Sequence, residues 1–285
     1  LTGGARLDRH SYFGFFASPR AGILLLPTDG SVFKILYGRA FRAPNPRELL
    51  VVVRQDEEGQ NLFTAGNAAL SPEVIDTVET ELTWSPWDPM NLRFAAFGSR
   101  VGQEINPESG NDPKLGTDYY ENRGEATILG GEAQGTVDAG PFEIDVAYSA
   151  TRAVDGTTSR AQYGVPVHMV NGRLGLEALP GMRVSLLVDH VGKRLRQQWT
   201  QQSGRPDGPA YTLMHLAAAT DAMANGRVRA DLSIRNLLDT RYENLVYLDD
   251  ANRTTTNDAG QTVARFPKDL EAEGRTIVVG LEVLY

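Results

Sequence analysis

Apolar and polar residues alternate over many short segments of this chain, the pattern of β-strands with one apolar and one polar face. In segment 142–151 every even-numbered residue is apolar, and the residues between them include Glu143 and Asp145. Segments 227–235 and 276–285 show the same period of two, although the last one also carries apolar Val278 and Leu284 on its second face. The pattern predicts an all-β protein.

The same reading along the whole chain predicts about 12 strands. They are expected at residues 1–9, 21–27, 32–41, 70–84, 92–102, 123–138, 142–151, 166–179, 182–194, 211–221, 227–236 and 275–285.

One of these segments, 70–84, has a competing interpretation. Ser71-Pro72-Glu73 would make a reasonable helix start. The polar residues Thr77, Glu79, Glu81 and Thr83 nevertheless recur at every second position, opposite Val78, Leu82 and Trp84. This period of two favours a strand.

Short and long connections alternate between the expected strands. The short ones are residues 28–31, 85–90, 139–141, 180–181 and 222–226, and a short aromatic loop is expected at 10–16. The longer ones are residues 45–69, 103–120, 154–165, 197–210 and 243–273. Short turns on one side and long loops on the other are typical of an antiparallel, up-and-down transmembrane β-barrel of a bacterial outer membrane.

Composition narrows the function classes. A net charge of -8 over 285 residues argues against nucleic acid as a partner. The absence of cysteine excludes disulfides, thiolate metal sites and cysteine nucleophiles. No apolar run approaches the roughly 18 residues of a membrane-spanning helix, which leaves barrel strands as the only route for membrane insertion.

Residues able to perform chemistry are scattered. The chain has no Gly-x-Ser-x-Gly elbow, phosphate-binding loop or dinucleotide-binding glycine pattern. Its four histidines, His10, His168, His190 and His215, lack metal-ligand spacing and are expected at the interface or in the lumen. Calcium binding by Asp249, Asp250, Asn252 and Asp258 is an alternative to a solvated loop, which we favour because the spacing matches no EF-hand. We therefore predict no catalytic residue, metal site or cofactor, and no enzyme.

Four motifs in order carry a family resemblance: Tyr37-Gly-Arg-Ala-Phe-Arg-Ala-Pro-Asn-Pro46, a Leu70-x-Pro-Glu strand entry, Asn236-Leu-Leu-Asp-Thr-Arg-Tyr242, and Gly274-Arg-Thr276 before a last strand ending in Tyr285. Together they resemble the C-terminal β-barrel portion of a TonB-dependent outer-membrane receptor, of the siderophore and cobalamin receptor family. In that family the last residue is more often phenylalanine than tyrosine.

The resemblance implies a plugged barrel of roughly 22 strands, to which residues 1–285 contribute the C-terminal part, while the plug and the first strands are absent from this chain. It implies active uptake of a scarce ligand, such as a ferric siderophore, haem or cobalamin, across the outer membrane of a Gram-negative bacterium. The extracellular loops 45–69, 103–120, 197–210 and 243–273 are then expected to capture the ligand.

The resemblance also implies partners. These are the TonB–ExbB–ExbD energy-coupling complex through the missing N-terminal region, an iron–siderophore or similar ligand, outer-membrane lipid, and the barrel-assembly machinery, which would read Tyr285.

Charged and aromatic side chains have expected places on such a wall. Inward-facing arginines are expected to pair with acidic residues in ladders that hold the wall in register; the alternative is that they line a channel or contact a plug. The arginines are Arg183, Arg227, Arg229 and Arg235, and the acidic partners are Glu79, Glu81, Glu143, Asp145 and Asp231. Two aromatic girdles are expected, Trp84, Trp87 and Tyr285 near the short turns and Tyr148, Trp199, Tyr211 and Tyr242 near the long loops. Arg205 and Arg253 would suit an anionic ligand or plain solvation.

Two alternatives of other classes remain. A closed 12-stranded barrel would act as a passive pore or as an outer-membrane enzyme. A soluble β-sandwich binding module would pack its apolar strand faces inward.

Overall fold

The computed structural model describes residues 1–50, 66–108, 119–156, 159–196, 206–221, 227–245, 254–256, 262–264 and 269–283. The chain divides into two compact units, and each is described by itself. Unit 1 comprises Leu1–Thr83, Phe94–Gly131 and Arg152–Gln162, and unit 2 comprises Trp84–Arg93, Glu132–Thr151 and Tyr163–Tyr285.

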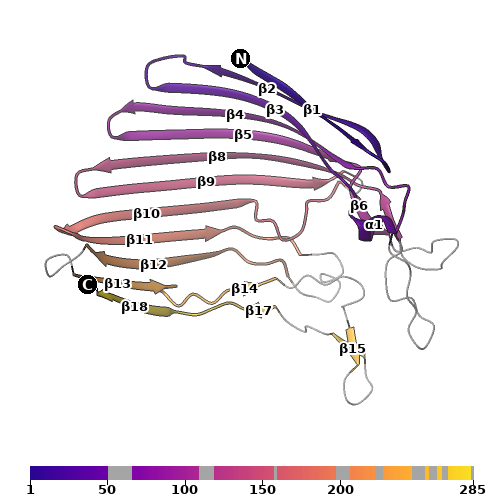
Figure 1. Ribbon diagram of the computed structural model, residues 1–285. Coiled ribbons are helices and arrows are strands. Elements are labelled where there is room, and N and C mark those ends of the chain that lie inside the picture. Colours follow the sequence, from indigo (N-terminus) through magenta and orange to yellow (C-terminus); the bar gives the residue numbers. More distant parts are fainter. Residues whose placement is uncertain are drawn as a thin grey trace. The chain divides into compact units, whose positions relative to one another are not determined.

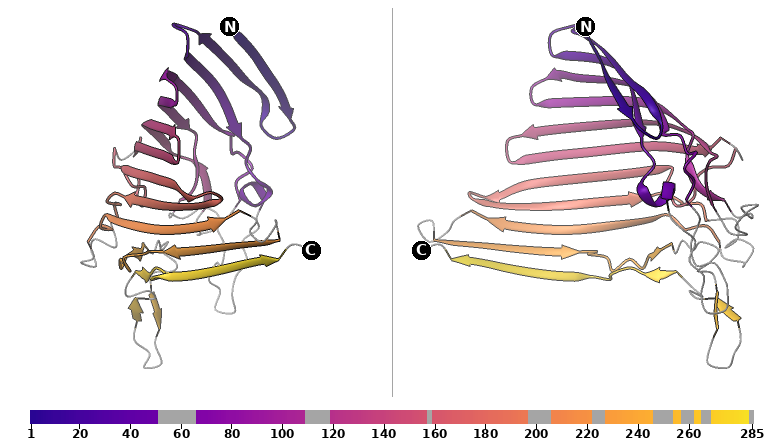
Figure 2. Two further views of the ribbon diagram at one scale, coloured as in Figure 1. Left: turned by 90° about the vertical axis from the view of Figure 1, so that its left-hand side faces the viewer. Right: turned by 45° about the vertical axis from the view of Figure 1, so that its right-hand side comes forward.

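Twelve strands join in one sheet, in the order β1-β2-β3-β4-β5-β8-β9-β10-β11-β12-β13-β18 (Figure 1). Their bounds are β1 Thr2–His10, β2 Gly14–Leu25, β3 Ser31–Arg42, β4 Glu73–Trp87, β5 Met90–Gly102, β8 Glu125–Ala139, β9 Phe142–Asp155, β10 His168–Leu179, β11 Met182–Val191, β12 Tyr211–Thr220, β13 Val228–Arg235 and β18 Thr276–Val283. Each strand neighbours the next sheet strand along the chain, which is an up-and-down arrangement, as all views show (Figure 2).

Smaller elements lie in the long connections. Helix α1, Pro46–Leu50, follows β3. Three two-stranded sheets pair β6 (Ile105–Glu108) with β7 (Tyr119–Asn122), β14 (Glu243–Asn244) with β17 (Leu270–Glu271), and β15 (Thr254–Thr256) with β16 (Thr262–Ala264).

Very little of the described chain is buried. Only five hydrophobic residues are buried among those described, namely Leu49, Leu70, Ile105, Ala126 and Ala153. A soluble domain of this size normally has a contiguous packed core. A single sheet with so small a core contradicts the β-sandwich alternative.

The two faces of the sheet differ as the alternation predicts. On β9 of unit 2, Phe142, Ile144 and Val146 are 49%, 41% and 48% exposed on one face. In unit 1, Val78 and Leu129 are similarly open to the surroundings. Soluble monomers rarely expose such continuous apolar surface, so this face requires an apolar environment.

Tight hairpins join several strands on the side away from the long connections. Gly140-Pro141 joins β8 to β9, and Pro180-Gly181 joins β10 to β11. Gly140 and Gly181 have φ angles of 62° and 76°, which two-residue hairpins need and which glycine adopts without steric cost.

Three boundary predictions were wrong. The turn expected at 85–90 shrinks to Asp88-Pro89, since β4 continues to Trp87 and β5 begins at Met90. The aromatic loop expected at 10–16 ends earlier, because β2 begins at Gly14. The connection expected at 45–69 is not loop from its start, because helix α1 begins at Pro46.

Candidate ligand-binding loops and their bases

The four loops predicted to capture a ligand are described at their bases, and their central parts lie outside the described residues. In unit 1 the loops 45–69 and 103–120 follow β3 and β5. In unit 2 the loops 197–210 and 243–273 follow β11 and β13. The described residues show how each pair of loops is fixed where it leaves the sheet.

Loop 45–69 begins with a capping box. The N–H of Glu48 donates to Asn45 Oδ1 at 2.9 Å, and the N–H of Asn45 donates to Glu48 Oε2 at 2.8 Å. Pro46 occupies the first helical position, where its missing N–H is no loss. Asn-Pro-Arg-Glu is thus a local helix-start sequence, which reasoning from strand patterns missed.

An arginine fork ties this helix to the wall. Arg42, the last residue of β3, donates from Nη2 to Glu73 Oε1 at 2.8 Å and from Nη1 to Glu48 Oε1 at 3.0 Å. Glu73, the first residue of β4, also accepts the N–H of Ile105 at 2.8 Å. The Arg42 hydrogen bonds are the main reason that the pKa of the Glu73 carboxyl lies below its usual value, and the Ile105 N–H adds to the effect against the opposing effect of burial. Glu73 therefore remains ionised and anchors two loops.

Loops 45–69 and 103–120 are also in contact at their C-terminal ends, where each chain segment returns to the sheet. The Asn67 side chain donates to the Tyr120 carbonyl at 2.9 Å. Asn122 accepts the N–H of Ser71 at 2.7 Å and donates to the Ser71 carbonyl at 2.8 Å. Beside these bonds Leu49, Leu70 and Ile105 form a buried apolar cluster with Tyr120 packed against it. The bases of the two loops therefore form one packed structure.

The loops of unit 2 are joined by buried charges. Arg196 and Asp269 are 3% and 5% exposed and form a two-pronged ion pair. The neighbouring Arg194 donates to the carbonyl of Glu243 at 3.1 Å and lies over the Tyr211 ring, 5.2 Å from its centroid. Tyr211 in turn stacks on Tyr242 with ring centroids 4.5 Å apart.

The Asn236-to-Tyr242 motif forms the corner below loop 243–273. Asn236 is only 3% exposed and has a φ of 50°, a conformation that asparagine tolerates better than most residues. Its side chain bonds the backbone of Thr240, and Asp239 Oδ1 accepts the N–H of Arg275 at 2.9 Å. The corner thus connects the end of β13 to the start of β18.

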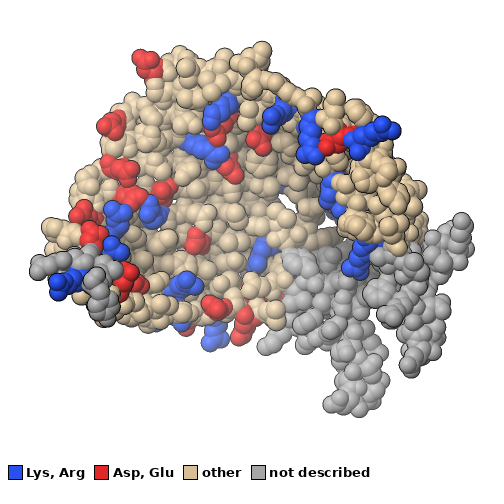
Figure 3. Space-filling view, viewed as in Figure 1, with Lys and Arg blue, Asp and Glu red and all other residues tan. Residues whose placement is uncertain are grey.

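Charged side chains on the sheet pair across neighbouring strands or, for Arg183 on β11 and Glu143 on β9, across one intervening strand. Figure 3 shows basic and acidic groups side by side on the viewed face. The described pairs include Lys34–Glu81 at 2.7 Å, Arg93–Glu132 at 3.2 Å, Arg183–Glu143 at 3.6 Å and Arg229–Glu282 at 3.4 Å. Arg183 pairs with one of the acids expected for the inward-facing arginines. Arg229 and Glu81 pair instead with residues outside the expected sets, Glu282 and Lys34.

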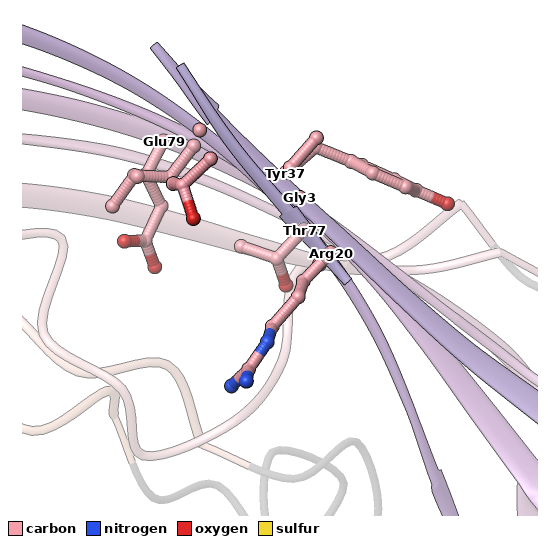
Figure 4. A pocket seen from close by; sticks show the side chains of 10 residues that line it. Gly3, Arg20, Tyr37, Thr77 and Glu79 are labelled. Atoms are coloured by element: carbon pink, nitrogen blue, oxygen red, sulfur yellow. The ribbon is translucent and has the colours of Figure 1, made fainter. Parts of the chain in front are cut away.

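Unit 1 also contains a cavity of about 420 Å³ against β1 to β4. Arg20, Thr77 and Glu79 point to one side of the strands, and Tyr37 points to the other (Figure 4). Arg20 lies in register between Gly4 and Gly38, so the adjoining strands present no side chain beside it. Gly38 lines the cavity, and a Cβ there would meet no atom within 4 Å, so its missing side chain contributes to the hollow.

The histidines have ordinary hydrogen-bonding or stacking roles. His168 bonds the Tyr148 hydroxyl at 2.8 Å, His190 bonds Thr212 at 2.9 Å, and His215 contacts Asp189 at 3.1 Å. His10 stacks on Phe13. No group of three or more metal-ligating side chains occurs among the residues that the structure describes.

Several predicted residues lie outside the described residues. They are Asp249, Asp250, Asn252 and Asp258 of the oxygen-rich cluster, the loop arginines Arg205 and Arg253, and the aromatic residues Trp199 and Tyr285. Among the residues that the structure describes, no helix is long and apolar enough to cross a membrane.

The protein is one up-and-down sheet with an apolar face, a face that carries charge pairs, and long loops anchored at their bases. These features define its structural class, the wall of a β-barrel receptor. A family model described as "TonB dependent receptor-like, beta-barrel" matches residues 1–237. The chain belongs to this family.

Solved structures of low sequence identity share the fold. The siderophore receptor PirA from Acinetobacter baumannii matches with a TM-score of 0.74 and 16% identity, over 99% of this chain and 43% of its own. A mutant ferric enterobactin receptor, PfeA, from Pseudomonas aeruginosa matches with a TM-score of 0.73 and 18% identity, over 99% and 42%. The copper transporter OprC matches with a TM-score of 0.67 and 18% identity, over 94% and 39%.

The chain thus spans about two-fifths of the length of these proteins. The comparison with curated proteins finds no match.

Proposed function

We propose that this chain is the C-terminal part of the wall of an outer-membrane receptor that takes up a scarce ligand, such as a ferric siderophore, haem or cobalamin. Membership of the TonB-dependent receptor family is the observation that carries this proposal. The anchored bases of loops 45–69, 103–120, 197–210 and 243–273 support a capturing role for those loops. In this proposal the remaining strands and a plug belong to other parts of the intact protein.

Energy for uptake would come from the TonB–ExbB–ExbD complex acting on the plug, and no covalent chemistry is needed. The exposed apolar face of the sheet suits outer-membrane lipid, because the outward face of an outer-membrane barrel carries an apolar band. Recognition of Tyr285 by the barrel-assembly machinery is part of the same proposal.

An uptake assay tests the function. The intact gene is expressed in a Gram-negative strain lacking its own siderophore receptors, and uptake is measured with radiolabelled ferric enterobactin, ferric citrate and haem, and with labelled cobalamin. The proposal expects uptake of one substrate above the vector control and its loss in an isogenic strain without TonB. Uptake that persists without TonB would support the passive-pore alternative.

The same set of labelled substrates identifies the class of ligand. Copper is added to the set because a copper transporter shares the fold. If none of the substrates is taken up in the presence of TonB while the protein is folded in the outer membrane, the proposed uptake of these ligand classes is wrong.

A further inference from the structure

The ion pair between Arg196 and Asp269 bridges two of the proposed capture loops across 73 residues of sequence. Arg196 Nη1 donates to Asp269 Oδ1 at 2.8 Å, and Nη2 bonds the second carboxylate oxygen. Each side chain is only 4% exposed. Such a fork allows one relative orientation of the two groups, so it fixes direction as well as distance.

Each partner is attached to its own loop as well. Arg196 donates from Nε to the Pro206 carbonyl at 2.6 Å, and its N–H donates to Asp207 Oδ1 at 3.0 Å. These bonds close the base of loop 197–210. The backbone pairing of Arg194 with Gly208, at 3.0 and 2.9 Å, closes it further.

Asp269 stands directly before β17, which pairs with β14 at the start of the same loop. The N–H of Ala272 donates to the carbonyl of Tyr242 at 3.0 Å and extends this pairing. The side chain of Arg194 reaches the Glu243 carbonyl of β14. The base of loop 243–273 is therefore a small closed structure. Its described polar links to loop 197–210 are made by the two arginines, and the Leu245 side chain lies against Gly208 beside them.

Stability alone does not explain a charged pair here. Replacing a buried ion pair with packed apolar side chains is often neutral or stabilising, whereas removing one partner leaves a buried charge at a high energetic cost. An apolar contact would hold the loops together but allow them to slide. The directional pair fixes their relative placement.

We propose that Arg196 and Asp269 are positioning residues that couple the described bases of loops 197–210 and 243–273, so that both loops leave the sheet in one relative placement suited to ligand capture. The statement about ligand capture rests on the proposed function. The coupling itself does not, and the two can be tested separately.

Hydrogen exchange in the intact receptor tests the coupling without a ligand. Asp269→Leu is expected to speed exchange of the Arg196 and Gly208 amides, on the other loop, by at least about tenfold, because exchange reports the free energy of local opening. Arg196→Met is expected to do the same at Ala272. The double variant should add little to either single variant, since both remove the same contact.

Arg229→Met is the matched control, because it removes an ion pair of the same unit whose side chains are 55% and 57% exposed. It should leave these amides unchanged. If each variant speeds exchange only within its own loop, or if the effects of Arg196→Met and Asp269→Leu simply add, the coupling is disproved.

Uptake separates positioning from plain folding. With radiolabelled ferric enterobactin as probe, the single variants are expected to raise the KM several-fold with the maximal rate per folded receptor retained. The reversed pair, Arg196→Asp with Asp269→Arg, is expected to recover part of the affinity. An unchanged KM in variants that show faster exchange would disprove the positioning role. Absence of wild-type uptake of this probe would count against enterobactin as the ligand, while the exchange result still decides the coupling.

Discussion

The side chain of Asn236 is hydrogen-bonded twice to the backbone of Thr240: Oδ1 accepts its N–H at 2.8 Å, and Nδ2 donates to its carbonyl at 2.9 Å. A single buried side chain thus replaces the backbone pairing that ends with β13. The Asn236 N–H itself donates to His215 Nδ1 at 3.2 Å. The corner is therefore fixed to the neighbouring strand as well as to itself.

Two substitutions of Asn236 should lower the free energy of unfolding by different amounts, which separates the contribution of its side-chain hydrogen bonds from that of its backbone conformation. Asn236→Ala loses the side-chain bonds and places alanine, which tolerates positive φ less well than asparagine, at φ 50°, so we expect the free energy of unfolding to fall by about 2–3 kcal/mol. Asn236→Gly loses the same bonds without the backbone strain and should fall by about 1 kcal/mol less. Urea unfolding of the intact receptor in lipid vesicles measures both. Equal losses would show that the backbone conformation contributes nothing.

A side chain at Gly130 should destabilise the protein because it would collide with the Phe97 ring. A Cβ placed on Gly130 would overlap the Phe97 ring, whereas one on the next residue, Gly131, would approach the Ala95 carbonyl only to 3.4 Å. Overpacking of this kind costs about 1–3 kcal/mol, so Gly130→Ala should unfold at lower urea than Gly131→Ala. The added variant Phe97→Leu should relieve the defect. Identical behaviour of the two glycine variants would contradict the described packing.

The Arg42–Glu73 fork predicts a pH dependence at the loop bases. Glu73 begins the 15-residue strand β4, which is longer than the about 9–11 residues in which a tilted strand crosses a bilayer. Its bonds to Arg42 and to the N–H of Ile105 place it at the bases of the long loops, outside the spanning part. Its pKa is lowered in the folded state, hence the unfolded state binds the proton more readily as the pH falls. The stabilisation is complete above the ordinary glutamate pKa of about 4.3 and is lost as the pH falls through the lowered folded value.

Glu73→Gln tests that dependence. The difference in unfolding free energy between wild type and variant should be largest above about pH 5 and should shrink on acidification. Circular dichroism of urea unfolding at several pH values measures it. A difference that stays constant from neutral to acidic pH would contradict the role of the Glu73 charge.

Exposed ion pairs of the sheet should matter little. Arg229 and Glu282 lie in register on β13 and β18 and pair at 3.4 Å with more than half of each side chain exposed. Exposed pairs contribute about 0–1 kcal/mol, so Arg229→Gln should leave the urea midpoint nearly unchanged at low salt. A loss as large as that of Asn236→Ala would show that the charge ladder, rather than strand pairing, holds this edge.

The sheet could be predicted because its signal is local. Alternation in 142–151 and 227–235 has the period of the strand itself, and the strands β9 and β13 confirm it. The turn expected at 85–90 is shorter in the structure, because β4 continues through Pro86 to Trp87. One missing donor near the end of a hairpin does not end the pairing, and Ser85 Oγ donates to Asn91 across that turn at 2.6 Å.

The loop bases were less predictable. The capping box from Asn45 to Glu48 was readable from four consecutive residues. In contrast, no local pattern marks Arg196 or Asp269 as partners, since their pairing depends on the course of two loops and the chain between them. The alternation of short and long connections located the loops, and the family resemblance gave them a role, but neither indicated the contacts that fix them.

A membrane-spanning wall requires the apolar face of the sheet to meet lipid, and β9 offers a direct test. The chain contains no cysteine, so single cysteines can be introduced along residues 142–149, after replacement of any cysteine elsewhere in the intact receptor. Reaction with a charged, membrane-impermeant maleimide is then measured in outer membranes. We predict slow reaction at the even positions Ile144 and Val146, which face lipid, and faster reaction at Glu143 and Asp145. Equal reaction at even and odd positions, or the opposite alternation, would contradict the assignment of this chain to a membrane-spanning barrel wall.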